Sequence, residues 1–245
     1  MKYRRKTAFG TRRDPWRNTM AKKEIPWTKI LGRLMVVGIT LMITMVAPNI
    51  VVRSANMYQY TLDASQVLNT AGVAVEEADV ISAMADFMKH KSDTVTLVSK
   101  AKYMPEDVFT KPAKQLMENF QRIADVELIL GIVGFLVVFV CFFFLIRWRK
   151  KKEHMQYLRY SIVAVVATSL IVLATKAIGP LYRHTWAKMA PGNLKEDDFI
   201  MGIINGNFMR QSGVITFIVA LVMLALLGYI TWEISGNKRV FKDTY

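Results

Sequence analysis

Apolar residues along this chain gather in four long blocks, and polar and charged residues lie between them. The hydrocarbon core of a bilayer is about 30 Å thick, so a helix needs roughly 20 apolar residues to cross it. Each block reaches that length. We therefore expect an all-α, polytopic membrane protein with four transmembrane helices and a helical extracytoplasmic cap. The expected transmembrane helices cover residues 31–52, 127–147, 160–180 and 212–234.

The segment between the first two blocks, residues 53–126, is the longest polar stretch and carries its own apolar pattern. Apolar residues recur there at spacings of three and four, which is typical of an amphipathic helix with one buried face. They are Val75, Ala78, Ile81, Met84, Ala85 and Met88. Further on, Thr110 is placed to cap a second helix with Pro112 in its first turn, and we expect that helix to continue into the second block. A flexible connector is the alternative, and this periodicity argues against it.

Basic residues cluster next to the apolar blocks. The chain has 33 lysines and arginines against 19 acidic residues, a formal net charge of +14. Basic residues concentrate in an arm over residues 1–30, a loop over 148–159 and a tail over 235–245, which fall on one side of a four-span chain. Positive charge beside spans stays in the cytoplasm. We therefore expect a multi-pass cell-membrane protein with cytoplasmic N- and C-termini, and outer loops over residues 53–126 and 181–211.

The composition also limits which partners and which kinds of chemical site are expected. Positive charge beside apolar blocks indicates membrane lipids as partners and no nucleic acid, although an arginine-rich start also occurs in organelle transit peptides. A single cysteine, Cys141, excludes an intramolecular disulfide. The three histidines are His90, His154 and His184, and no Cys/His cluster, phosphate-binding glycine loop or nucleophile-elbow motif is present. We therefore expect no metal and no cofactor.

Polar residues suited to catalysis lie where the second and third blocks end on the expected outer side. His184 follows the third block, and Asp125 and Arg122 precede the second. Each is within a turn or so of its span, at 1.5 Å per residue, so we expect His184 and Asp125 at a similar membrane depth. Such residues around an interfacial groove support acid–base chemistry on a lipid ester. The alternative is ordinary loop charges among interfacial anchors. Arg53, near the outer end of the first block, can snorkel to the interface.

Several short segments, in their order along the chain, resemble one known family. Before the second block they are Tyr58-Gln59-Tyr60, a helix ending Asp86-Phe87-Met88, Phe109, and Arg122-Ile123-Ala124-Asp125-Val126. In the second outer loop they are Tyr182-Arg183-His184-Thr185-Trp186, the pair Asp197 and Asp198, and Asn207-Phe208. This layout over residues 31–235 resembles the Lit-type lipoprotein intramolecular transacylases, a family of four-span bacterial membrane proteins. That family has a histidine where this chain has Arg122, so the chain resembles a degenerate member.

The resemblance implies an enzyme that moves an acyl chain from the glycerol of a lipid-modified cysteine to the free α-amino group. It implies His184 as the base, Asp125 as its orienting carboxylate or Arg122 as a donor to the oxyanion, and no cofactor. A lipoprotein would then be a partner beside membrane lipids. The second function class is a non-enzymatic membrane subunit or scaffold whose outer cap binds a partner membrane protein. Arg122 in place of histidine favours the scaffold, and the clustered polar residues favour the enzyme.

Overall fold

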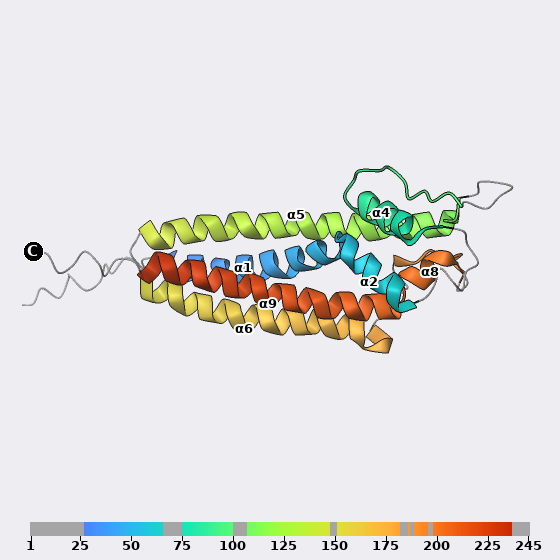
Figure 1. Cartoon of the computed structure of the whole chain (residues 1–245). Coiled ribbons are helices and arrows are strands. Elements are labelled where there is room, and N and C mark those ends of the chain that lie inside the picture. The colour runs from blue at the N-terminus through green and yellow to red at the C-terminus, as the bar shows by residue number, and fades with distance from the viewer. Residues whose placement is uncertain are drawn as a thin grey trace, which may run out of the picture.

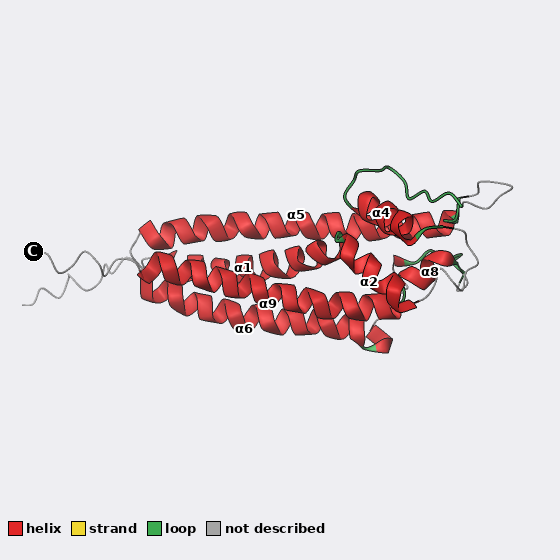
Figure 2. Ribbon diagram, in the orientation of Figure 1, coloured by secondary structure: helices red, strands yellow, loops and turns green. Residues whose placement is uncertain are grey.

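Figure 1 shows the computed structural model, a bundle of long helices with shorter helices gathered at one end. The structure describes residues 27–65, 75–99, 107–147, 151–181, 186, 189–195 and 198–236. The helices are α1 (Trp27–Val52), α2 (Ala55–Ser65), α4 (Glu77–Met88), α5 (Lys111–Arg147), α6 (Lys151–Ala177), α8 (Phe199–Ile203) and α9 (Gly206–Gly236). Over these residues Figure 2 is all helix and loop, with one isolated β-bridge between Val98 and Asp107. The expected all-α class is confirmed.

Helices α1, α5, α6 and α9 are long and apolar enough to cross a membrane, which confirms the four expected spans. Helix α5 begins at Lys111, so the second cap helix and the second span form one continuous helix, as the sequence predicts. Helix α1 begins at Trp27 and α6 at Lys151, earlier than the expected spans. The α6 extension contains two lysines and an arginine, which are good helix formers and extend a helix beyond its apolar part.

Helix α1 lies at the centre of the bundle, where it packs against α5, α6 and α9. Its apolar stretch is 56% buried, whereas the stretches of α5, α6 and α9 are 28%, 22% and 22% buried. Helix α5 packs mainly on α1 and exposes a face of isoleucine, valine and phenylalanine side chains. In a bilayer the hydrocarbon chains of lipids cover such a face. Its side chains are apolar, and the backbone polar groups beneath them form their hydrogen bonds within the helix.

Glycines allow α1 and α5 to approach each other closely. A Cβ atom added to Gly134 would lie 2.7 Å from the backbone nitrogen of Met42 and 2.9 Å from the carbonyl oxygen of Gly38. Both atoms belong to the α1 backbone and cannot rotate away. A Cβ atom added to Gly38 would lie 3.1 Å from the carbonyl oxygen of Gly134. Small residues of this kind are typical of helix contacts inside membranes, where close backbone packing stabilises the pair.

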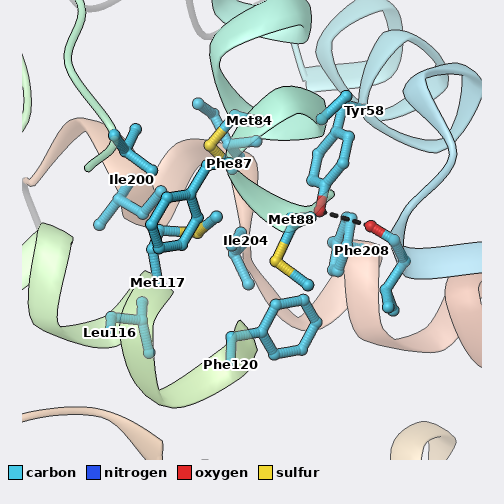
Figure 3. Packing of buried hydrophobic residues seen from close by; sticks show 14 of the residues in the cluster. Tyr58, Met84, Phe87, Met88, Leu116, Met117, Phe120, Ile200, Ile204 and Phe208 are labelled. Atoms are coloured by element: carbon cyan, nitrogen blue, oxygen red, sulfur yellow. Dashed lines mark hydrogen bonds between the residues drawn. The ribbon is translucent and has the colours of Figure 1, made fainter. Parts of the chain in front are cut away.

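Beyond the spans, a cap with its own apolar core covers one end of the bundle. It is built from α2, α4, α8 and the adjoining turns of α5 and α9. Figure 3 shows side chains from all these elements in one cluster. Within it the Tyr58 ring stacks on Phe208 with centroids 5.8 Å apart, and the Tyr58 hydroxyl donates to the Val52 carbonyl at 2.7 Å. Tyr58 therefore ties the corner between α1 and α2 to α9.

Polar contacts fix the starts of two cap helices. The Ala113 backbone N–H donates to the Thr110 hydroxyl at 3.3 Å, so Thr110 caps α5 with Pro112 in its first turn, as the sequence predicts. The Thr110 hydroxyl itself donates to one oxygen of Asp198, whose other oxygen accepts from the Ile200 N–H. Asp198 therefore caps α8 and joins its start to the start of α5.

Helix α4 buries a face that differs in part from the expected stripe. Met84 and Met88 are fully buried, as the apolar spacing predicts. Ala78 is exposed, so its expected burial was wrong. The physical reason is that Ala78 lines an open groove between α4 and α2. Val80 and Phe87 lie on the buried face instead.

Candidate functional site

Asp125 is the centre of a polar cluster at the junction of the cap and the bundle. It lies on α5 just before Leu128, where the apolar stretch of that helix begins. Its Oδ1 accepts a hydrogen bond from Arg53 Nη2 at 2.5 Å and lies 2.9 Å from His90 Nε2. Arg53 is 72 positions and His90 is 35 positions from Asp125 in the sequence. The cluster is therefore a product of the fold.

Arg53 follows α1 directly, and the last turn of that helix holds its guanidinium. Arg53 Nε donates to Asn49 Oδ1 at 3.0 Å, and Asn49 Nδ2 donates to the Met45 carbonyl at 3.2 Å. The Arg53 side chain is only 19% exposed. It pairs with Asp125, because the fold places this carboxylate close to the end of α1. The position of Arg53 relative to the membrane interface stays a prediction.

His90 lies immediately beyond α4 in a left-handed backbone conformation, with φ of 56°. The His90 N–H donates to the Phe87 carbonyl at 2.9 Å and the Lys91 N–H to the Asp86 carbonyl at 2.9 Å. This is the Schellman arrangement that ends many helices, and its left-handed position is usually glycine. A side chain there costs about 1–2 kcal/mol. Backbone strain of this kind clusters at functional sites, and here the residue that bears it contacts Asp125.

Helix α5 holds the end of α4 in place with two residues one turn apart. Gln121 Nε2 donates to the Phe87 carbonyl at 2.5 Å. Residues four apart lie on one face of a helix, so Gln121 and Asp125 meet the same final turn of α4. Phe120 and Ala124, beside them, are buried in the cap core. The position of His90 relative to Asp125 is thus fixed by packing as well as by their own contact.

The charges of this cluster favour a histidine with one free nitrogen. Arg53 is permanently charged and stabilises the ionised Asp125 carboxylate. An ionised carboxylate only accepts hydrogen bonds, so His90 Nε2 carries the proton and a neutral imidazole keeps its lone pair on Nδ1. The side chains of His90 and Asp125 are 54% and 33% exposed. The imidazole is therefore accessible to a molecule that docks at the cluster.

Tyr58 lies in the same corner but is not suited to act as a base. Burial raises the pKa of its hydroxyl, and the nearby positive charge of Arg53 opposes that effect only in part. Its hydroxyl therefore stays protonated and donates to the Val52 carbonyl. This leaves the imidazole of His90 as the candidate base of the cluster, because its Nδ1 is not used in the contact with Asp125.

The site residues expected from the sequence fall in three different places. Asp125 lies at the centre of the cluster. Arg122 is exposed on α5, and the arginine that binds Asp125 is Arg53. His184 lies outside the described residues, so its proximity to Asp125 stays a prediction. Within the part of the chain that the structure describes, no group of three or more His, Cys, Asp or Glu residues is arranged to hold a metal ion.

Arg53 and His90 were not predicted from the sequence as candidate site residues. One signal for His90 was present, because the apolar spacing of α4 stops at Met88 and glycine is usual just beyond such an end. A histidine in place of the usual glycine therefore indicates a position where the side chain has a role. No sequence signal pointed to Arg53, because an arginine after a span is ordinary.

The fold of this chain can be compared with those of solved structures. This chain is similar to the membrane-integral lipoprotein intramolecular transacylase Lit from Bacillus cereus, with a TM-score of 0.63 and 11% identity over 84% of this chain and 96% of that one. The chain has the Lit fold. Two Lit variants in which one histidine is replaced match with a TM-score of 0.64 and 10% identity. The arginine variant covers 88% of this chain and 95% of its own, and the alanine variant 84% and 93%.

The Lit fold confirms at the level of structure the resemblance that the short sequence segments suggest. Nearly the whole of the Lit chain has a counterpart here, so the match includes the cap as well as the spans. No protein-family model and no curated protein sequence matches the chain. The likeness therefore lies in the arrangement of helices and not in a high share of identical residues.

Proposed function

We propose that this chain is a lipoprotein acyltransferase that acts on lipid-modified substrates at the outer leaflet of a cell membrane. The observation that carries this proposal is the cluster of His90, Asp125 and Arg53 at the cap end of a bundle with the Lit fold. The similar solved proteins are lipoprotein intramolecular transacylases. Membrane lipids and a lipoprotein are accordingly the proposed partners.

The proposed reaction is an acyl transfer from oxygen to nitrogen within one lipoprotein. The α-amino nitrogen attacks the ester carbonyl, a C–N bond forms, and the C–O bond to the glycerol breaks. His90 Nδ1 accepts the amine proton and returns it to the departing glycerol oxygen, so the step needs no cofactor or co-reactant. Asp125 orients the imidazole and stabilises its charged form, as the carboxylate of a catalytic triad does.

Three further residues have proposed roles in the same reaction. Arg53 keeps Asp125 ionised and is a positioning residue. Arg122, exposed on the same helix as Asp125, is the proposed donor to the oxyanion. His184 stays the alternative base predicted from the sequence, and His184→Ala is expected to abolish product formation if His184, and not His90, accepts the amine proton. A histidine at either place would act by the same proton transfer.

A second candidate function is favoured by one observation. Arg122 occupies the place where the resembling family has a histidine, and a guanidinium cannot act as a base. A non-enzymatic membrane subunit or scaffold that binds a partner membrane protein through the cap fits this replacement. The two candidates differ in whether the chain changes the chemistry of a lipoprotein.

Expression in a bacterial strain without other N-acylating enzymes tests the proposed activity. Mass spectrometry of the N-terminal lipopeptide is expected to show the diacylglyceryl form converted to an N-acylated lyso form of the same mass. The two forms are distinguished by fragmentation, because the acyl group moves from the glycerol to the amine. A lipopeptide that stays unchanged with the intact protein in the membrane would reject the enzyme in favour of the scaffold.

The proposed orientation places the cap outside the cell. The cap and the basic ends of α5 and α6, at Arg147 and Lys151, lie at opposite ends of the bundle (Figure 1), and basic ends stay in the cytoplasm. With Cys141 replaced, a cysteine at Asn193 is expected to react with a membrane-impermeant thiol reagent on intact cells. A cysteine at Lys151 is expected to stay unlabelled, and the opposite result would reverse the orientation.

A further inference from the structure

An open groove runs along the surface of the cap between α2 and α4. Its volume is about 570 Å³. One wall is the first part of α2, at Ala55 and Gln59, and the other follows α4 from Glu77 to Lys89, the residue that caps its C-terminal end. None of the residues of the His90, Asp125 and Arg53 cluster lines it, so it is a separate feature of the surface.

The groove begins beside the candidate site on both of its walls. Lys89 lines the groove on α4 and directly precedes His90. Ala55 lines it on α2 and follows soon after Arg53 in the sequence. A ligand whose reacting end lies at His90 would therefore have the groove beside it on the surface of the cap.

The lining suits an extended peptide. Ala55 and Ala78 are small, so a backbone can approach closely, and Gln59 and Ser82 offer side-chain hydrogen-bonding groups. The Ser82 hydroxyl donates to the Asp79 carbonyl at 3.1 Å, which leaves its oxygen as an acceptor. The 12 residues of α4 give a length of roughly 18 Å. At about 3.3 Å per residue, an extended strand of about five residues covers that length.

We infer that this groove binds the polypeptide segment that follows the acylated N-terminal residue of a lipoprotein substrate. The inference rests on the proposed function, because that function places the acylated residue at His90 and its acyl chains along the spans. The polypeptide must then leave the site on the cap side, where the groove begins. On the α4 wall the Asp86 carboxylate pairs with Lys91 at 3.3 Å, so the charges of the walls do not select between a basic and an acidic side chain in the bound segment.

The test compares two diacylglyceryl lipopeptides on the purified full-length protein in lipid vesicles. One ends after the lipid-modified cysteine, and the other continues for six more residues. The KM is expected to be about tenfold lower for the longer lipopeptide, a difference of about 1.4 kcal/mol. Ala78→Trp fills the groove and is expected to raise the KM of the longer lipopeptide to that of the shorter one, with kcat unchanged. Ala83→Trp, on the same helix but outside the groove lining, is the matched control and is expected to leave both values unchanged.

A second measurement does not depend on turnover. A photoreactive residue in place of Ser82 is expected to cross-link to the third to fifth residues of the longer lipopeptide. Equal KM values for the two lipopeptides, without cross-links at Ser82, would overturn the groove and leave the proposed activity intact. Cross-links without conversion of either lipopeptide would support the groove and overturn the activity. The absence of both conversion and cross-links would overturn both.

Discussion

His90→Gly is expected to lower the rate of N-acylation by about 10²–10⁴-fold, the usual contribution of a general base. The substitution removes the imidazole that accepts the amine proton. It is expected to leave the cap folded, because glycine is the residue best suited to the left-handed position at the end of α4. The relief of backbone strain offsets the loss of a half-exposed contact with Asp125, which is worth up to about 1 kcal/mol. Mass spectrometry of the lipopeptide and a thermal unfolding curve measure the two effects.

His90→Asn is the matched control for this experiment. Asparagine also tolerates the left-handed conformation and keeps a polar side chain near Asp125, but it cannot accept a proton near neutral pH. It is therefore expected to be folded and as inactive as the glycine variant. Full N-acylation by both variants would remove His90 from the reaction and leave His184 as the remaining candidate base. Unfolding of both variants would contradict the assignment of a left-handed turn at this position.

Met84→Asp is expected to lower the free energy of unfolding by several kcal/mol, because it places an unpaired carboxylate in the cap core. The Met84 side chain is fully buried among residues of α2, α5 and α8. Figure 3 shows it directed into this cluster beside Phe87. The variant is expected to be expressed at a reduced level and to unfold at a clearly lower temperature in detergent, as measured by fluorescence-detected size-exclusion chromatography after heating.

Ala78→Asp provides the control on the same helix. The sequence pattern places both residues on one apolar stripe, whereas in the structure Ala78 is exposed at the groove. Its replacement is therefore expected to change the free energy of unfolding by no more than about 0.5 kcal/mol. Equal destabilisation by the two aspartates would mean that α4 buries the stripe expected from the sequence. Wild-type stability in both variants would mean that the cap core does not contribute to folding.

The sequence by itself determined the class of the protein and the arrangement of its spans. Four apolar blocks of sufficient length predict four membrane helices, because a bilayer imposes one length on every span and backbone groups in hydrocarbon must pair internally. Thr110 and Pro112 likewise predicted the start of α5, since capping depends on residues close in the sequence. Asp125 was predicted as a candidate site residue because it lies next to an apolar block, a position that the sequence shows directly.

Only the tertiary structure decided which residues surround Asp125. Arg53 and His90 come from the ends of α1 and α4, and their contacts with Asp125 depend on how these helices pack on α5. The spacing of apolar residues gives the period of a helix but not its rotation, so it could not show that Val80 and Phe87 are buried while Ala78 lines a groove. The physical reason is the same in both cases. Periodicity and capping are local, whereas the rotation of a helix and the partners of its last turn are set by side chains that are distant in the sequence.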